Sequence, residues 1–195
     1  GEEAPQYVLP GETLVREGRG PRETLADSGA VGVITGERIL FAVDNGRRVD
    51  EAANVHHCDV KAANFESGLL SSEFVVKDWD GPSYRLDPDG DSDLFEEATD
   101  FLDRASACWG TAESLLDELD VKVTNIDNYT GNDSFEPVAR ALVEAGETIE
   151  EIETKIADAG LTDALGPRLD RTQADLRDGH IEARRTRASK LIDEG

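Results

Sequence analysis

Residues 32–43 read GVITGERILFAV and form the most apolar stretch of this chain of 195 residues. The polar segment Thr35-Gly36-Glu37-Arg38 separates two runs of β-forming residues. Two such runs joined by a short turn that contains glycine are typical of a β-hairpin. The stretch therefore predicts two antiparallel strands joined at residues 35–38.

Turn residues divide the rest of the first half into short segments. Pro10-Gly11 and Asp44-Asn45-Gly46 each favour a turn, because Gly and Asn accept positive φ and Pro fixes its own φ. Runs of β-forming residues between the turns predict strands at 12–19, 31–34, 39–43, 47–49, 55–65, 73–79 and 84–86. The first half is therefore expected to be an antiparallel meander of about seven strands.

The hydrophobic period changes near residue 93. Asp93-Leu94-Phe95-Glu96 has the pattern of a capping box, in which the aspartate accepts from first-turn amides and the glutamate reaches back. Apolar residues then recur at helical spacing at Leu94, Phe95, Ala98, Phe101, Leu102 and Ala105. We expect an amphipathic helix that covers the open end of the sheet.

The order of these segments resembles the pleckstrin-homology-like domains of bacteria and archaea. The resemblance covers about residues 8–106 and rests on PGE at 10–12, GVITGERILFAV at 32–43, a long segment at 54–76 that contains Gly68-Leu69-Leu70, and SYRL at 83–86. The motif residues are Thr35, Arg38 and Gly68. The resemblance implies a bent sheet or barrel, and a protein segment or a membrane surface as ligand. A structural role is favoured for Arg38, whose guanidinium can tie the turn to a neighbouring strand.

The second half is predicted to be helical. Helices are expected at 111–119, 135–145, 147–159, 168–178 and 181–193, with a short strand at 121–126, because Gly146, Gly160, Gly166 and Gly179 lie where helices commonly end. The predicted fold class is α+β, with a β-domain at 1–108 and a bundle of short helices at 109–195.

The charge balance is the strongest compositional signal. The chain has 43 acidic and 20 basic residues, and its formal net charge is −23. Such a surplus repels itself unless counterions screen it, as they do in molar salt. The composition resembles that of proteins from extreme halophiles, so we expect most carboxylates to hold water, K⁺ and Na⁺ at the surface.

Two further features bear on the cellular compartment. No apolar run approaches the length that spans a bilayer, and residues 1–5 lack the pattern of a secretion signal, which favours a cytoplasmic protein. Cys58 and Cys108 are too few for a disulfide framework, and two thiols are favoured over a disulfide between them.

Two segments have the residue types of metal sites. His56-His57-Cys58-Asp59 falls in a predicted strand, where alternate side chains point to opposite faces, so an ordinary strand is favoured over a zinc site. The acidic run DPDGDSD at 87–93 starts like a calcium loop, but Ser92 and Ala98 occupy the positions of the required Gly and Glu. No metal or other cofactor is expected.

Catalytic and nucleotide-binding patterns give no positive signal. The chain has three histidines, two of them adjacent, and so offers few candidates for the base that activates a catalytic nucleophile. No glycine-rich phosphate-binding motif occurs in the sequence. Residues 141–160 resemble a helix-turn-helix with its turn at Gly146, but the second helix is acidic, which favours a packing hairpin over DNA reading. We expect a protein without enzymatic activity.

The sign of the charge reverses near the end of the chain. Residues 168–190 contain seven bases against four acids. The candidate binding residues are Arg168, Arg171, Arg177, Arg184, Arg185, Arg187 and Lys190. This helix can dock on the acidic body, on a second copy, on a protein partner, on anionic lipid or on nucleic acid; docking within the chain or between copies is favoured.

The leading functional hypothesis is a binding or scaffolding module for proteins or a membrane surface. A membrane role requires a cluster formed by Arg16, Arg19, Arg22, Arg47 and Arg48. The alternative is a regulator that binds nucleic acid through the basic helix.

Overall fold

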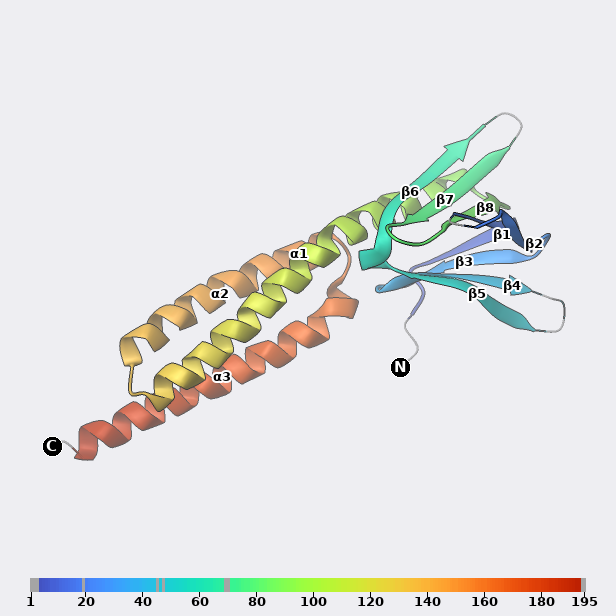
Figure 1. Ribbon diagram of the computed structural model, residues 1–195. Helices are drawn as coiled ribbons and strands as arrows, with labels where there is room; N and C mark the ends of the chain where they lie inside the picture. The colour runs from blue at the N-terminus through green and yellow to red at the C-terminus, as the bar shows by residue number, and fades with distance from the viewer. Residues whose placement is uncertain (1–3, 19, 45, 47, 69–70, 194–195) are drawn as a thin grey trace. The chain divides into compact units, whose positions relative to one another are not determined.

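The computed structural model describes residues 4–18, 20–44, 46, 48–68 and 71–193, and it divides into two compact units (Figure 1). We call residues 1–109 the sheet unit and residues 110–195 the helical unit. The boundary lies one residue beyond the predicted one, within a long helix. The fold class is α+β, as predicted.

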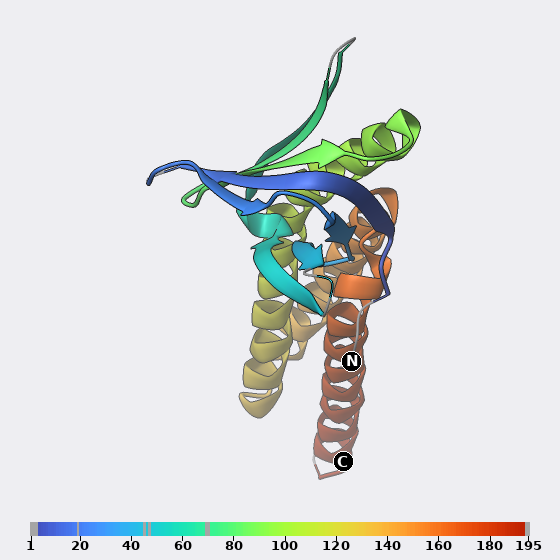
Figure 2. The same ribbon diagram turned by 90° about the vertical axis from the view of Figure 1, so that its right-hand side faces the viewer.

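In the described part of the sheet unit, eight strands form one antiparallel sheet in the order β5-β4-β3-β1-β8-β7-β6, with β2 paired to β1. The strands are β1 (Tyr7–Glu17), β2 (Glu23–Ala26), β3 (Ala30–Ile34), β4 (Arg38–Asp44), β5 (Val49–His56), β6 (Val60–Ser67), β7 (Ser72–Asp78) and β8 (Ser83–Pro88). The sheet is bent, but β5 and β6 do not pair, so it is not closed into a barrel (Figure 2).

The opening stretch forms the β3–β4 hairpin, as predicted. Ile34 lies opposite Ile39, and both side chains are fully buried. The buried Thr35 organises the turn: its hydroxyl accepts from the amides of Glu37 and Arg38, and its own amide donates to the carbonyl of Arg38. A tight turn leaves some backbone amides without a backbone acceptor, and side-chain hydrogen bonds of this kind supply the acceptor.

Two fold-motif residues have partners that the sequence did not indicate. The Arg38 guanidinium lies 3.1 Å from a carboxylate oxygen of Glu37, within the turn itself, and this contact is not the predicted tie to a neighbouring strand. The amide of Gly68 donates to the carbonyl of Ser71 at 3.0 Å and closes the β6–β7 turn. Leu69 and Leu70 of the predicted Gly-Leu-Leu turn lie outside the described residues, as does Arg47 of the predicted strand at 47–49.

The predicted strand at 55–65 is broken by a short 3₁₀ helix, η1 (His57–Asp59). His57 is fully buried there; its amide donates to the carbonyl of Glu37, and its Nε2 lies 2.9 Å from the carbonyl of Thr35. These bonds turn the chain between β5 and β6. The expectation that alternate residues of 56–59 share a strand face is therefore wrong. Strand β2 was missed because its four residues carry little apolar pattern.

A single long helix, α1 (Ser92–Gly131), follows the sheet. Its cap is Asp91, whose carboxylate accepts from the amide of Asp93, so the predicted capping box starts two residues too late. Phe95 packs against Phe65 and Phe74, with ring centroids 5.5 and 5.7 Å away. The first part of α1 covers the sheet as predicted.

The helical unit contains the rest of α1 together with α2 (Phe135–Asp158) and α3 (Thr162–Asp193). These three long helices replace the predicted string of short ones and the predicted strand at 121–126. Of the four glycines predicted to end helices, Gly146, Gly166 and Gly179 lie inside helices, and Gly160 directly follows the C-cap of α2, with φ of 73°. The packing hairpin favoured for 141–160, like the helix-turn-helix it resembles, is wrong for the same reason, since α2 runs straight through Gly146.

Packing explains why the helices continue through glycine. A glycine in a helix costs about 1 kcal/mol relative to alanine. The burial of helix residues both before and after the glycine outweighs this cost. In α2 the buried residues recur at helical spacing across Gly146: Ala141, Ala145, Thr148, Ile152 and Ile156. In α3, Gly179 permits a close approach to α1, because a Cβ there would lie 3.4 Å from Ile126 and 3.2 Å from Asp127.

The Thr35 turn gives the first prediction. Thr35→Val removes a hydroxyl that accepts two amides, and leaving buried amides unpaired costs about 1–3 kcal/mol in the free energy of unfolding. Chemical unfolding in molar KCl, followed by the fluorescence of the buried Trp109, measures the loss. Thr35→Ser keeps the hydroxyl and should lose less than Thr35→Val; equal losses would contradict the role of the hydroxyl.

The glycines give the second prediction. Gly146→Ala should raise the free energy of unfolding by roughly 0.5–1 kcal/mol, since a Cβ there meets nothing within 4 Å and alanine favours the helix. Gly160→Ala is the matched control and should destabilise, because φ of 73° strains an L side chain. A destabilised Gly146→Ala would mean that the helix ends at that residue after all. Denaturant titration of both variants provides the comparison.

Candidate functional site

A groove runs between α2 and α3 and encloses about 410 Å³. We call it the α2–α3 groove. Its lining residues are Phe135, Val138, Ala139 and Leu142 from α2, and His180, Ala183, Arg184 and Arg187 from α3. Each helix contributes residues at spacings of three, four and seven, which is the spacing of one helix face.

The α2 wall of the groove is apolar and anchored in the core. Val138 and Ala183 line the groove and also belong to the buried cluster that contains Ile126 of α1. Ala139 is exposed in the groove, and Leu142 is half-buried. The floor is therefore part of the buried core of the helical unit, and the apolar side chains above it are at least partly exposed.

The α3 wall carries the charge. Arg184 and Arg187 are exposed, and the guanidinium of Arg187 lies 6.0 Å from the ring centroid of Phe135. A cation over an aromatic face is held there by the ring's negative face while it keeps its donors available. His180 lies on the same wall, and the described lining residues include no carboxylate.

The other flank of α3 has the opposite character. A second groove of about 620 Å³, between α1 and α3, is lined by Val123, Asp127, Asp175, Asp178, Gly179, Ile181, Glu182 and Arg185. Four of these side chains are carboxylates, and Arg185 lies 3.9 Å from that of Glu182. Helix α3 thus separates an apolar, cationic groove from an acidic one.

Two of the predicted binding residues dock within the helical unit. Arg168 lies 2.6 Å from Asp117 and 3.1 Å from Asp120, and the hydrogen bond to Asp117 raises the pKa of its guanidinium above the usual value. Lys190 lies 2.7 Å from Asp133 in the α1–α2 turn. These cations hold α3 against the acidic helix α1 and its turn.

The predicted set therefore divides by position. Arg168 and Lys190 dock on carboxylates, Arg185 lies in the acidic groove, and Arg171 and Arg177 are exposed elsewhere on α3. The structure brings only Arg184 and Arg187 together in the α2–α3 groove.

The apolar half of the groove was missed by the sequence analysis. Phe135, Val138 and Leu142 carry the only sequence signal, an apolar spacing of three and seven residues next to the start of a predicted helix. That spacing predicts a buried face but does not indicate which helix lies beside it.

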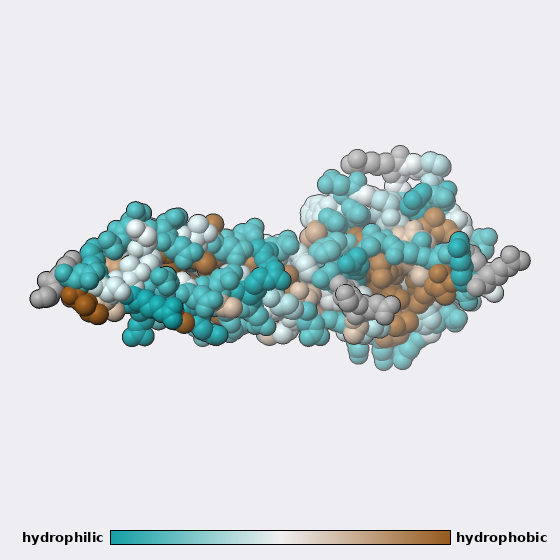
Figure 3. Space-filling view, turned by 90° about the horizontal axis from the view of Figure 1, so that it is seen from below, coloured by the Kyte–Doolittle hydropathy of each residue, from teal (hydrophilic) through white to brown (hydrophobic). Residues whose placement is uncertain are grey.

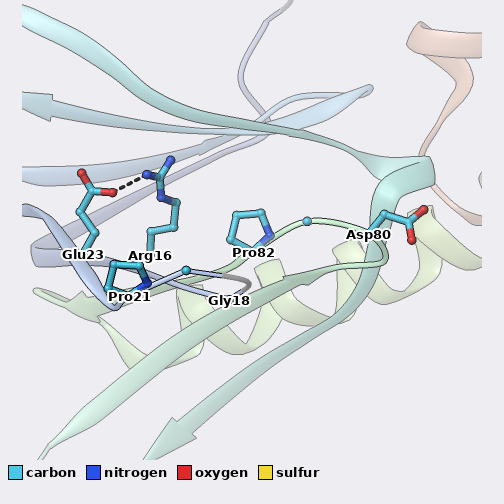
Figure 4. Close-up of a pocket in the computed structure, with 8 residues that line it drawn as sticks. Arg16, Gly18, Pro21, Glu23, Asp80 and Pro82 are labelled. Carbon is cyan, nitrogen blue, oxygen red and sulfur yellow. Dashed lines mark hydrogen bonds and ion pairs between the residues drawn. The ribbon is translucent and has the colours of Figure 1, made fainter.

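The sheet unit has a pocket of about 470 Å³ at the ends of β1, β2, β7 and β8, lined by Arg16, Gly18, Gly20, Pro21, Glu23, Asp80, Gly81 and Pro82 (Figure 4). Arg16 and Glu23 point toward each other and form an ion pair. Arg22 pairs with Glu17, and Arg48 with Asp50. The three described arginines of the membrane hypothesis are thus each charge-balanced; Arg19 and Arg47 lie outside the described residues.

The sheet unit also presents apolar side chains on its outer face. Val8, Val33 and Leu40 lie side by side in the register of β1, β3 and β4, and Val8 is 51% exposed. Figure 3 shows hydrophobic residues gathered on one side of this unit, whereas the helical unit is mostly hydrophilic in the same view (Figure 3).

The His-Cys segment is occupied by packing and capping contacts. Nδ1 of His56 accepts from the amide of Cys58 and caps η1, and its ring lies edge-on to Trp109 at 4.6 Å. Cys58 is exposed and Cys108 is half-buried. Within the described ranges, no group of three or more His, Cys, Asp or Glu side chains is placed to hold a metal ion.

The acidic run at 87–93 has local structural roles. Asp87 accepts a hydrogen bond from the Thr13 hydroxyl, and Asp91 caps α1. Asp87 therefore joins β8 to β1, and Asp91 starts the helix that follows the sheet.

None of the helices in the described part of the chain combines the length and apolar character needed to cross a bilayer. No protein-family model matches the chain, and none of the curated proteins matches it.

Proposed function

We propose that this chain is a non-enzymatic binding module that captures an acidic segment of a partner protein in the α2–α3 groove. The observation that carries the proposal is the convergence of Arg184, Arg187 and His180 beside an apolar wall in a chain of net charge −23. A ligand of the groove has to offer both apolar side chains and carboxylates.

The contrast between the two flanks of α3 supports a protein ligand. A nucleic acid that contacts the whole set of predicted basic residues would also meet the carboxylates of Asp175, Asp178 and Glu182, which line the same groove as Arg185. Phosphate backbones bind clustered cations and are repelled by such neighbours. An apolar groove of this size instead suits protruding side chains of a peptide.

The sheet unit is proposed to be of pleckstrin-homology type. Its bent antiparallel sheet, the Thr35-centred hairpin and the helix that covers the sheet support this assignment. The proposal adds a scaffolding role, in which the sheet unit contributes a further binding surface for proteins. The ion-paired state of Arg16, Arg22 and Arg48 argues against anionic lipid as its main ligand.

The setting we propose is the cytoplasm of an extreme halophile. The excess of 43 acidic over 20 basic residues supports this setting, because molar K⁺ or Na⁺ screens the repulsion between carboxylates. At that ionic strength long-range attraction is weak, so a specific ligand has to be held by close contacts. A groove with an apolar wall provides contacts that salt does not screen.

The third prediction tests the groove directly in 1 M KCl. A fluorescent peptide of about 15 residues, rich in leucine and glutamate, should bind the full chain, and Ala139→Tyr should weaken binding about tenfold by filling the groove. Ala139 is exposed, so the larger side chain leaves the core intact. Fluorescence anisotropy measures the affinity, and thermal unfolding checks that the variant is folded.

Charge-reversal variants provide the matched control. Arg184→Glu with Arg187→Glu should also weaken binding about tenfold, whereas Arg171→Glu with Arg177→Glu makes the same change in net charge outside the groove and should have little effect. Equal effects of the two pairs would contradict the groove.

The nucleic-acid alternative has its own signature. Binding of a DNA duplex that weakens steeply with salt, and that is lost when Arg184, Arg185 and Arg187 become alanine, would replace the proposed function.

A further inference from the structure

The walls of the α2–α3 groove have the geometry of a helix-binding seam. Lining residues run from Phe135 to Leu142 on α2 and from His180 to Arg187 on α3, so each wall extends over about 10 Å, or two helical turns. The two helices are antiparallel, since Arg187 faces Phe135 at the start of α2. The seam between two such helices is the surface on which another helix packs its side chains.

The groove and α1 use different flanks of the α2–α3 pair. Ile126 of α1 packs with Val138, Ala141 and Ala183, and Asp127 of α1 lies beside Gly179 on the opposite side of α3 from Arg184. A helix in the groove would therefore not compete with α1. It would complete a four-helix arrangement around Val138 and Ala183, in which pairs of helices share buried residues.

The distribution of charge restricts the sequence of such a helix. Both arginines project from α3, while the α2 wall presents Phe135, Ala139 and Leu142. The bound helix thus needs apolar residues facing α2 and carboxylates three or four positions away on the side that faces α3. A basic helix would place its cations against Arg184 and Arg187.

Building on the proposed function, we infer that the segment captured by the groove is an amphipathic acidic helix of at least two turns, supplied by a partner protein. Charge complementarity with Arg184 and Arg187 is the reason for choosing this occupant over a basic or uncharged one. The interaction is a helix-in-groove contact, with affinity from the apolar wall and selectivity from the arginines.

The fourth prediction separates helical from extended binding. The probe is the leucine and glutamate peptide with leucine at every third or fourth position. The control is the same peptide with two central alanines replaced by proline. This replacement breaks the helix and leaves the charge of the peptide unchanged. In 1 M KCl the full chain should bind the helical peptide at least tenfold more tightly than the proline peptide, as measured by fluorescence anisotropy.

Two further measurements define the site and the charge requirement. Ala139→Tyr should remove the preference for the helical peptide. A peptide with lysine in place of glutamate should bind at least tenfold more weakly, and any residual binding should be insensitive to Ala139→Tyr.

Each contrary outcome has a distinct meaning. Equal, groove-dependent affinities for the helical and proline peptides would overturn the helical partner and leave the proposed function standing. Absence of binding by both peptides would overturn both. Light scattering that shows a dimer for the wild-type chain and a monomer for Ala139→Tyr would overturn the partner protein and assign the groove to a second copy.

Discussion

The buried imidazole of His57 connects three parts of the sheet unit. Because a carbonyl only accepts, the 2.9 Å contact with Thr35 places a proton on Nε2, which donates to the β3–β4 turn. The same ring contacts Phe101 and Trp109 of α1, with centroids 5.7 and 6.0 Å away. The hairpin at 32–43, the break between β5 and β6 and the packing of α1 all meet at this residue.

The negative charge of the chain imposes a second constraint. With 20 bases for 43 acids, acidic elements that pack together need cations or counterions between them. Arg168 bridges two carboxylates of α1, and Lys190 contacts the α1–α2 turn, so both ends of α3 are held against acidic neighbours. Exposed pairs of this kind contribute little each, and the apolar core supplies most of the stability. Arg184 and Arg187 differ from these cations because they line a groove with Phe135, and the described lining of that groove includes no carboxylate.

Local patterns predicted the strands better than the helices. Alternating apolar residues and turn residues located β3, β4 and β7, since a strand's period and its turns are both local properties. The helix ends predicted at Gly146, Gly166 and Gly179 were wrong: these residues lie inside helices, whereas glycine favours a helix end where its backbone adopts positive φ, as at Gly160. Whether it does so depends on burial on both sides of the glycine. The site was predicted only in part: the cations of α3 were identified, but not the α2 residues that accompany Arg184 and Arg187.

The sequence alone determined the α+β class, the hairpin at 32–43, the amphipathic start of α1 and the reversal of charge along 168–190, because each depends on residues close together in the chain. The tertiary structure decided that the sheet stays open, that His57 is buried and that α2 and α3 run through their glycines. It also decided which arginines dock on carboxylates and which line the groove. These outcomes depend on contacts between residues far apart in sequence, such as Phe135 with Arg187 and Asp117 with Arg168, and no local pattern specifies them.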